Sequence, residues 1–394
     1  MELTNTQILL QYFVQGLPFG ALVALIAVGY TMVYGIIQLV NFAHGEVFMF
    51  GAYIFLTLIT DLDLPGETSD NLFWGQALAV ILAITWATTL NVFLPQRLRG
   101  SGRAALALGL GGAAGASMYP VLCQPVPFLL AYPLAVLHTA TIGVTMDRAA
   151  YRPLRRAPRL TALITAIGVS FFLLNLAQGI WEARPRTLPS DAVPRLLQSP
   201  ATVTEPLGWA ETVRTTGRIP ITSWLDTSVR DVVIVCVCLA AMLALRLLIM
   251  RSRIGKAMRA CSQDKTTARL VGINVDYVVA VTFATGAAMA ALAAPLYILK
   301  GNFLAHNMGY IVGVLAFASA VLGGIGNIPG ALLGGFLIGT VTTMAPSLSR
   351  LDGPGWLTSL DLTPWSYSVA YVVMIAIIIF RPTGLLGRAS ATRA

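Results

Sequence analysis

Residues 41–46 place a group of hydrogen-bonding and ionisable side chains inside an otherwise apolar stretch. Asn41, His44 and Glu46 separate one apolar run from the next, with no linker between the two. An amide, an imidazole and a carboxylate at this spacing can orient a polar partner. A lipid core cannot hydrogen-bond a broken backbone, so a break persists only where protein or a water-filled path covers it. The segment therefore predicts either a capped turn at the membrane surface or the wall of a translocation path.

Two residues in this segment suit a sharp break between helices. Gly45 can adopt backbone angles that other residues avoid. Glu46 falls in the first turn of the next helix, where the positive end of the helix dipole stabilises a carboxylate. Polar side chains one helical turn apart in other apolar segments could line the same path, although packing and interhelical hydrogen bonds explain them equally well. The candidate path residues are Tyr30, Tyr34, Asn41, His44, Glu46, Asn175 and Gln178.

The composition places this segment in a membrane protein. The chain has 394 residues, 56% hydrophobic and 11% charged, with a mean hydropathy of +0.75. Soluble globular proteins carry about 25% charged residues, so we expect an all-α polytopic fold forming one transmembrane domain over residues 1–394. It should have about 10–11 transmembrane helices, some of them broken or re-entrant. The candidate spans are 8–40, 46–60, 74–94, 104–122, 126–148, 160–181, 230–250, 278–299, 310–325, 331–346 and 367–381. No tandem repeat is visible, and the side on which the N-terminus lies stays open.

The basic residues indicate topology rather than nucleic-acid binding. Seventeen of the 26 Lys and Arg residues fall in four short segments, including the C-terminal tail from Arg381. Cytoplasmic loops of membrane proteins carry such an excess, so we assign loops 95–103, 149–159 and 251–277 to the cytoplasm. Loop 182–229 balances five Arg with five acidic residues and is assigned to the periplasm as a loop or small hairpin.

Glycine is concentrated where helices are expected to pack closely. Gly111 and Gly115 form a small-xxx-small pair, and the run 321–335 holds six glycines. Small residues allow helix backbones to approach one another in membranes. We expect helix packing or a re-entrant turn at Gly323, Gly324, Gly326, Pro329 and Gly330. A nucleotide-binding turn is the weaker interpretation there, because no strand precedes it and the rest of the fingerprint is missing.

The longest polar segment between two spans on the cytoplasmic side is 251–276. Residues 254–271 have the period of an amphipathic helix, and Gly272 follows in the position of a terminating C′ glycine. Such a basic helix could lie on the lipid surface. Alternatively, it is a coupling helix that inserts into a groove on a cytoplasmic subunit.

The sequence carries little that would support catalysis or a cofactor. Among the four cysteines there is no CxxC pair, and the three histidines are far apart, so we predict no catalytic residues, no metal and no cofactor. No GxxxxGK[ST] motif is present, so any use of ATP requires a separate subunit. A secondary transporter or channel stays an alternative, but the spans hold few ionisable residues for ion coupling. A membrane enzyme is the weakest alternative.

Several motifs, in order, resemble the inner-membrane permeases of branched-chain amino acid ABC importers. They are GYTMVYGIIQLVNFAHGE, YRPLRR, RACSQDKTTARLVGIN, AVLGGIGNIPGALLGG and RPTGLLGR. The resemblance implies an ABC importer permease fold in the bacterial inner membrane, with ABC ATPase subunits, a second related permease and a periplasmic substrate-binding protein as partners. It favours leucine, isoleucine and valine as solutes, with urea or short amides as alternatives. It also implies an ATPase-coupling segment that contains Gly255, Arg259, Ala260, Asp264, Ala268, Gly272 and Asn274.

One segment departs from the family pattern. Between Trp74 and Arg148 the chain holds about 50 more residues than the resemblance leads us to expect. They read as an additional helical hairpin whose cytoplasmic turn contains Arg97, Arg99 and Arg103. Two added spans leave the sidedness of the later loops unchanged.

Cysteine labelling tests the predicted topology. In a background without the four native cysteines, Arg97→Cys, Arg155→Cys and Arg259→Cys should each resist an impermeant thiol reagent in intact cells, because their loops are cytoplasmic. Ser190→Cys should react. Labelling of the first three from outside would overturn the assignment.

Overall fold

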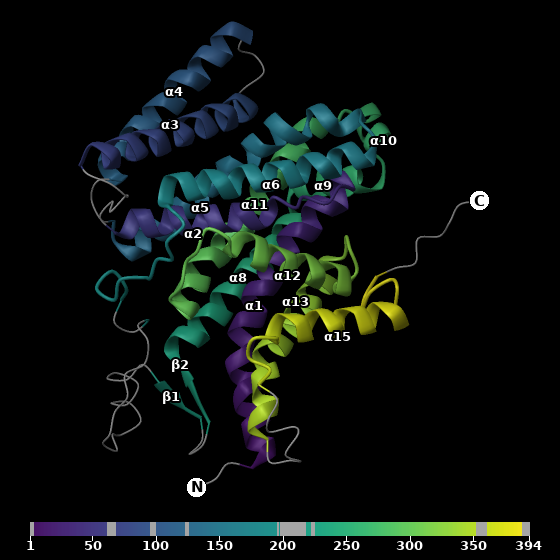
Figure 1. The fold of residues 1–394 in the computed structure, drawn as a ribbon. Helices are drawn as coiled ribbons and strands as arrows, with labels where there is room; N and C mark the ends of the chain where they lie inside the picture. Colours follow the sequence, from purple (N-terminus) through teal and green to yellow (C-terminus); the bar gives the residue numbers. More distant parts are fainter. Residues whose placement is uncertain are drawn as a thin grey trace.

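The computed structural model describes residues 4–60, 68–94, 100–122, 126–194, 197, 218–221, 225–351 and 361–387. All the long elements in these ranges are α-helices (Figure 1). The apolar helices are α1 (Asn5–Ile37), α2 (His44–Ile59), α3 (Thr68–Phe93), α4 (Gly100–Leu122), α5 (Phe128–Met146), α6 (Arg159–Trp181), α8 (Val229–Arg251), α11 (Val275–Gly301), α12 (Met308–Gly323), α13 (Ile328–Met344) and α15 (Ser366–Phe380). These helices match the predicted spans and confirm the all-α membrane fold.

Length divides these helices into two groups. Seven in the described ranges are long and apolar enough to cross a membrane by length and composition: α1, α3, α5, α6, α8, α11 and α13. Three others, α2, α12 and α15, are shorter. At 16 residues, α2 and α12 each extend only about 24 Å, less than the hydrocarbon core of about 30 Å. They are therefore too short to cross the core from side to side, and we call them the short central helices.

The remaining elements connect the bundle. They are the π-helix η1 (Asp147–Tyr151), the 3-10 turns η2 (Pro153–Arg156) and η4 (Ala345–Arg350), and the helices α9 (Arg253–Gln263) and α10 (Lys265–Leu270). Within loop 182–229, β1 (Arg218–Pro220) and β2 (Asp226–Ser228) pair antiparallel with Ile219 opposite Thr227. The chain between residues 198 and 217 lies outside the described residues.

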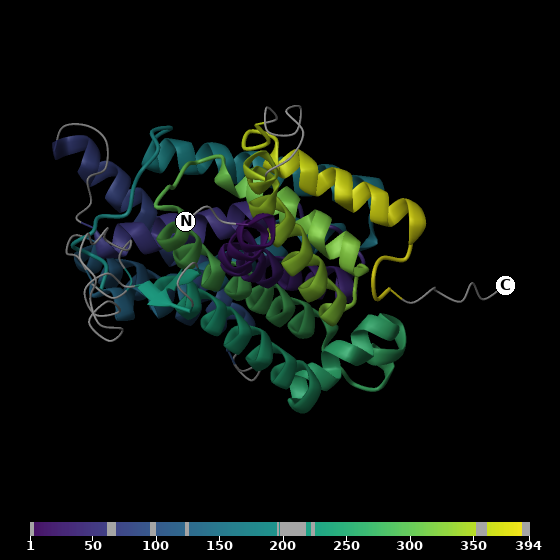
Figure 2. The same cartoon turned by 90° about the horizontal axis from the view of Figure 1, so that it is seen from below.

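The centre of the bundle is α1, which the other helices surround in the view of Figure 2. Small residues allow this burial, because they bring α1 and α13 into backbone contact. A Cβ on Gly335 would meet the backbone of Ala24, and one on Gly339 would meet the backbone of Gly20. Every residue of α2 is also buried. The polar residues that open α2 are therefore held inside the protein.

Two helix pairs of the same construction form this centre. In the first, α1 ends at Gln38, whose φ is 62°, and α2 begins at residue 44. In the second, α11 ends at Asn302, whose φ is 48°, and α12 begins at residue 308. Each left-handed cap is followed by a short loop and a helix of 16 residues. This internal repeat is not apparent from the sequence, where no tandem repeat is visible.

The predicted extra hairpin is present as α3 and α4, which lie at one edge of the bundle (Figure 1). The two helices pack through the expected glycine pair, because a Cβ on Gly111 would meet the backbone of Ala87 and one on Gly115 would meet Ala83. The Arg103 guanidinium donates to the carbonyl oxygens of Asn91 and Val92 at the end of α3. Residues 95–99 of the predicted turn lie outside the described ranges.

Two adjacent glycines of α4 provide a matched test of hairpin packing. Gly111→Val should lower the melting temperature of the detergent-purified protein, because overpacking costs about 1–3 kcal/mol and the neighbour of Gly111 is backbone. Gly112→Val should leave it unchanged, since nothing lies within 4 Å of a Cβ there. Equal melting temperatures for the two variants would contradict this packing.

Candidate functional site

The polar segment 38–43 folds back from the end of α1 into the protein. Near that end, the Lys265 ammonium donates to the carbonyl oxygen of Ile37 at 3.0 Å. The His44 imidazole instead lies beside Gly29, where it would contact a Cβ atom. Because Gly29 is eight residues before Ile37, it lies about 12 Å back along the helix. The segment is thus an internal break and not a turn at the end of the bundle.

The N-terminal turns of the two short central helices, α2 and α12, meet at this break. A Cβ on Gly45 would collide with the carbonyl of Gly309 and the Cα of Gly313. From this contact α2 runs toward Thr57, which accepts a hydrogen bond from the Trp181 indole at 2.9 Å. In contrast, α12 runs toward Gly323, whose carbonyl accepts from the amide of Leu386 in the C-terminal segment. The two helices therefore diverge from a shared polar junction.

Glu46 lies at this junction. Its side chain is buried at 1% exposure, and Oε1 accepts a hydrogen bond of 3.2 Å from the Ser170 hydroxyl of α6. Oε2 lies against Gly309 in the first turn of α12 and has no hydrogen-bond partner among the described residues. Helix N-termini carry partial positive charge and stabilise anions. The carboxylate is therefore placed where the dipoles of α2 and α12 both favour it.

Asn41 and His44 complete the polar junction. The Tyr151 hydroxyl, from the π-helix η1, donates to Oδ1 of Asn41 at 2.7 Å, and the Tyr30 ring lies 4.5 Å from the His44 ring between centroids. In the described part of the chain, Nδ2 of Asn41 has no hydrogen-bond partner. Unsatisfied buried polar atoms are rare and call for an explanation. Two of them, counting Oε2 of Glu46, lie at one junction.

A small cavity lies beside the junction. It has a volume of about 10 Å³, close to the least that holds a single water molecule. Phe317 borders it and contacts both Phe42, with ring centroids 5.4 Å apart, and Tyr30, at 6.2 Å. The lining residues are Tyr30, Thr31, Tyr34, Val40, Asn41, Phe317, Ala320 and Ile325. The junction is therefore enclosed in this conformation.

Two of the candidate path residues lie elsewhere. Asn175 and Gln178 are on the exposed face of α6, and the Asn175 amide donates to the carbonyl of Phe171 on its own helix at 2.7 Å. The buried side of α6 instead carries Ser170, which touches Glu46. Asn175 and Gln178 do share one face of α6, as their spacing predicts, but it is the exposed face. Tyr30, Tyr34, Asn41, His44 and Glu46 are the predicted residues that the fold brings together.

The glycine-rich run forms a tight turn between α12 and α13. Gly324 and Gly326 adopt positive φ values of 101° and 91°, which glycine tolerates. Gly323 and Gly330 approach so closely that neither could carry a Cβ atom. Pro329 occupies the first turn of α13, where its missing N–H costs nothing. The turn packs against Gly35, near the C-terminal end of α1.

The predicted coupling helix is two helices, which corrects the expectation of one continuous helix over 254–271. α9 ends at Gln263 and α10 begins at Lys265. Asp264 caps α10 by accepting from the Thr266 amide at 2.8 Å and from the Thr267 hydroxyl. An aspartate competes for backbone donors and favours such a cap over a helix interior. The hydrogen bonds from Thr267 and Thr266 hold the pKa of the Asp264 carboxyl below its usual value.

The end of α10 exposes two apolar side chains. Gly272, with φ 86°, and Ile273 donate to the carbonyls of Arg269 and Ala268, which is a Schellman termination. Just before it, Leu270 is 83% exposed and Val271 is 71% exposed. The apolar residues of the predicted amphipathic helix therefore do not share one face. Leu270 and Val271 are exposed, whereas Ala268 is buried, with an exposed fraction of 3%.

The other coupling candidates make contacts within the chain. The Arg259 guanidinium donates to the carbonyl of Ile249 at the end of α8, and Gly255 has the carbonyls of Leu248 and Ile249 where a Cβ would stand. Asn274 caps α11 by accepting from the Tyr277 amide at 3.1 Å. Ala260 is partly buried in α9. These residues fix the orientation of α9 and α10 on the bundle.

The segments predicted to be cytoplasmic lie together in space. Arg155 bridges Asp147, at 2.6 Å, and Asp276. Asp276 also pairs with Arg152 at 3.4 Å. These ion pairs join loop 149–159 to the end of loop 251–277. We call this end of the bundle the basic face.

Comparison with known proteins identifies the family. The model of the family described as "Branched-chain amino acid transport system / permease component" matches residues 12–105 and 104–378. The high-affinity branched-chain amino acid transport system permease protein BraD of Pseudomonas aeruginosa is 33% identical over 379 residues, covering 96% of both chains. The corresponding permease protein LivH of Escherichia coli is 34% identical over 382 residues, again covering 96% of both.

A further similarity is partial. The autoinducer 2 import system permease protein LsrC of Photorhabdus luminescens is 28% identical over 144 residues, 35% of this chain and 40% of its own. No solved structure matches the chain.

The chain belongs to this family of branched-chain amino acid transport permeases. It is the permease component of an ABC transport system, a multi-pass protein of the inner membrane. ATP hydrolysis resides in separate subunits.

Three substitutions test whether the junction serves transport. Glu46→Gln keeps the size of the side chain and should insert normally, but lower uptake per assembled complex at least about tenfold, because hydrogen bonds to charged groups are worth about 1.5–3 kcal/mol. His44→Ala should lower it less. Gly45→Val should prevent assembly because backbone occupies the Cβ position.

Gly35→Val is the matched control, since a Cβ there is 3.8 Å from the nearest atom. Uptake, complex yield and membrane insertion are measured for each variant. Wild-type uptake per complex by Glu46→Gln would contradict a transport role, as would a fall in uptake that only matches a fall in yield.

Proposed function

We propose that this chain forms half of the transmembrane path of an importer for leucine, isoleucine and valine. A second related permease forms the other half, two ABC ATPase subunits bind at the basic face, and a periplasmic binding protein delivers the solute. The choice of solutes rests on the family and on the names of the relatives that match over 96% of their length. The partial match to an autoinducer permease is the reason to test other solutes as well.

The junction of α2 and α12 is the observation that carries the proposed path. Oε2 of Glu46 and Nδ2 of Asn41 are buried without hydrogen-bond partners in the described part of the chain, and the buried His44 imidazole lies at the same junction. An amino acid is a zwitterion, so its ammonium group matches the carboxylate of Glu46 and its carboxylate matches a helix N-terminus. In the enclosed conformation these groups have no access to solute. We infer that the two helix N-termini separate during transport.

The exposed end of α10 supports the proposed coupling contact. Leu270 and Val271 form a small exposed apolar tip at the end of α10, and the hydrogen bonds of the following two residues hold this end in place. An apolar tip on the basic face suits a groove on a cytoplasmic subunit better than solvent. If an ATPase binds this tip, its movement would be transmitted directly to α11, because Asn274 caps α11 only three residues after Val271.

Reconstitution tests the function as a whole. The chain is expressed with its neighbouring permease, ATPase and binding-protein genes, and ATP-dependent uptake of a solute panel is measured in vesicles. Leucine, isoleucine and valine should be taken up, and urea, short amides and autoinducer-type sugars should not. Uptake of one of the latter in place of the branched-chain amino acids would assign a different solute.

The apolar tip gives a specific prediction. Replacing both residues, Leu270→Ser and Val271→Ser, should abolish co-purification of the ATPase and ATP-dependent uptake while leaving membrane insertion unchanged. Leu386→Ser, which removes an apolar side chain that is 43% exposed at the same end of the bundle, is the control. If the double variant co-purifies with as much ATPase as the wild type, Leu270 and Val271 do not form the coupling contact.

Two substitutions of Asp264 distinguish its role as a helix cap from a role of its negative charge. Asp264→Asn keeps a good cap and should retain activity if capping is the role, whereas Asp264→Ala should lose it, because such caps are worth about 1 kcal/mol. The depressed pKa of Asp264 keeps the charged cap at neutral pH, and it is lost only as pH falls through the folded-state pKa. Loss of coupling in both variants at neutral pH would instead assign the charge itself to the ATPase contact.

A further inference from the structure

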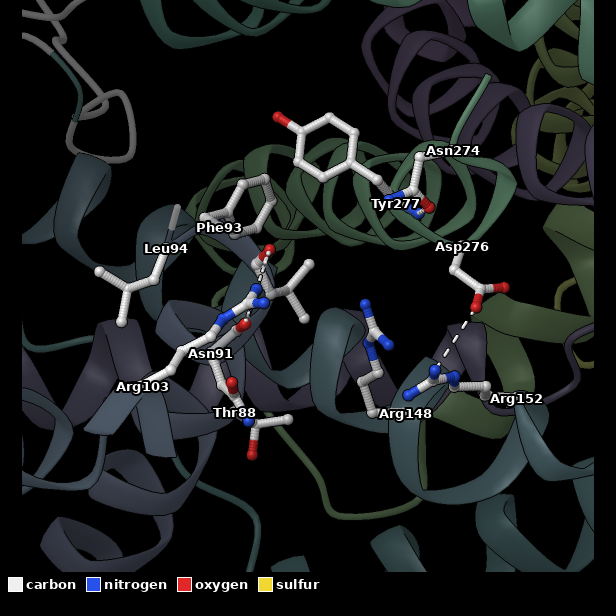
Figure 3. Close-up of a pocket in the computed structure, with 11 residues that line it drawn as sticks. Thr88, Asn91, Phe93, Leu94, Arg103, Arg148, Arg152, Asn274, Asp276 and Tyr277 are labelled. Atoms are coloured by element: carbon white, nitrogen blue, oxygen red, sulfur yellow. Dashed lines mark hydrogen bonds and ion pairs between the residues drawn. The ribbon is translucent and has the colours of Figure 1, made fainter. Parts of the chain in front are cut away.

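A wide pocket opens at the basic face, away from the junction. Its volume is about 750 Å³, and Figure 3 shows its lining. One wall is the end of α3 with the start of α4, and the other is η1 with the start of α11. The lining residues are Thr88, Asn91, Val92, Phe93, Leu94, Arg103, Arg148, Arg152, Asn274, Asp276 and Tyr277.

The charge of this pocket is unbalanced. Three arginines line it, Arg103, Arg148 and Arg152, against a single carboxylate, Asp276. That carboxylate is already shared, since it pairs with Arg152 at 3.4 Å and with Arg155 behind the pocket wall. The pocket therefore has a positive charge that the residues lining it do not neutralise.

Two of the guanidinium groups have unused donors. Nε of Arg148 and Nε of Arg103 are buried without hydrogen-bond partners in the described ranges. In Figure 3 the Arg148 guanidinium stands between the two walls with no interaction drawn to it, while Arg103 reaches the carbonyl oxygens at the end of α3. Guanidinium groups bind phosphate oxygens in a bidentate geometry. An oxyanion in the pocket would balance the charge of both arginines.

The apolar part of the lining indicates where such an anion comes from. The rings of Phe93 and Tyr277 lie 5.5 Å apart between centroids and connect the two walls. Val80 and Ile84 of α3, both 56% exposed, share a helix face with the lining residues Thr88 and Asn91, which follow Ile84 by four and seven residues. In a membrane this face of α3 contacts lipid chains, so the pocket lies where a chain region meets a headgroup region.

We propose that this pocket binds the phosphate of an anionic phospholipid from the leaflet at the basic face. The phosphate lies between Arg103 and Arg148, the hydroxyls of a glycerol headgroup contact Thr88 and Asn91, and the acyl chains follow the outer face of α3. Basic pockets between transmembrane helices bind anionic headgroups in this manner. A free phosphate would use the two arginines but not the apolar edge.

The position of the pocket gives the lipid a structural consequence. Arg103 belongs to α4 of the edge hairpin, Arg148 to η1, and Asp276 to the first turn of α11, directly after the proposed coupling segment. A bound phosphate would tie the α3–α4 hairpin to the segment that the ATPase is proposed to move. This consequence rests on the proposed function, whereas the binding itself does not.

Native mass spectrometry of the detergent-purified chain tests the binding. Titration with phosphatidylglycerol should give a one-to-one adduct that phosphatidylcholine does not give. The double variant Arg103→Gln with Arg148→Gln should weaken this adduct by about fivefold for each arginine, the equivalent of about 1 kcal/mol per basic residue. Arg251→Gln, an exposed arginine at the end of α8, should bind as the wild type does.

Three outcomes would overturn the proposal. The double variant could retain the phosphatidylglycerol adduct, phosphatidylcholine could bind equally well, or inorganic phosphate at the same concentration could displace the lipid, which would make the site one for soluble phosphate. Should the double variant fail to fold, Arg148→Lys and the comparison of the two lipids on wild-type protein decide. Arg148→Lys should keep a weakened adduct because it keeps the charge and loses the fork.

Discussion

The first turns of α2 and α12 are in contact, and the arrangement of the centre depends on that contact. It requires a glycine on each side, Gly45 against Gly309 and Gly313, because any Cβ would occupy the position of backbone atoms. Once the two N-termini meet, their dipoles point at one another and repel unless an anion lies between them. Glu46 supplies that anion, with Ser170 hydrogen-bonded to one oxygen. The carboxylate, the glycines and the short helices therefore form one interdependent unit.

This unit also explains why the helices around it have the lengths they do. A helix that starts inside the bundle can only reach one face, so α2 and α12 are short and run to opposite ends. The long helices α1 and α11 must then turn back toward the junction, and both do so through a left-handed cap, at Gln38 and Asn302. The side chains of Asn41, His44 and Glu46 are buried at the junction because the break between α1 and α2 lies inside the bundle.

Much of the fold could be predicted from the sequence, because hydropathy and helix length report directly on the membrane. The helices, the α3–α4 hairpin and the terminating Gly272 are all found where the sequence indicates them. The division into α9 and α10 at Asp264 could not be predicted, because the apolar residues keep a helical period across this position. Such a period carries no information about a side chain that caps a new helix. The spacing of Asn175 and Gln178 predicts that they share a helix face but not which face, and the structure places them on the exposed face of α6. The two helix pairs are not recognisable as a repeat in the sequence. The Asn-Phe and Ala-His steps at 41–44 and 302–306 fall at different distances from the equivalent caps, Gln38 and Asn302.

Cross-linking within one chain tests the internal break most directly. Phe42→Cys and Phe317→Cys are combined in a background without native cysteines, with a protease site inserted after residue 205, and the membranes are treated with a short bifunctional thiol reagent before cleavage. Because the Phe42 and Phe317 rings lie 5.4 Å apart between centroids, the two fragments should stay joined on a denaturing gel. Fragments that separate, when each single cysteine reacts with a thiol reagent in the unfolded protein, would place segment 38–43 away from α12 and contradict the meeting of the two short central helices.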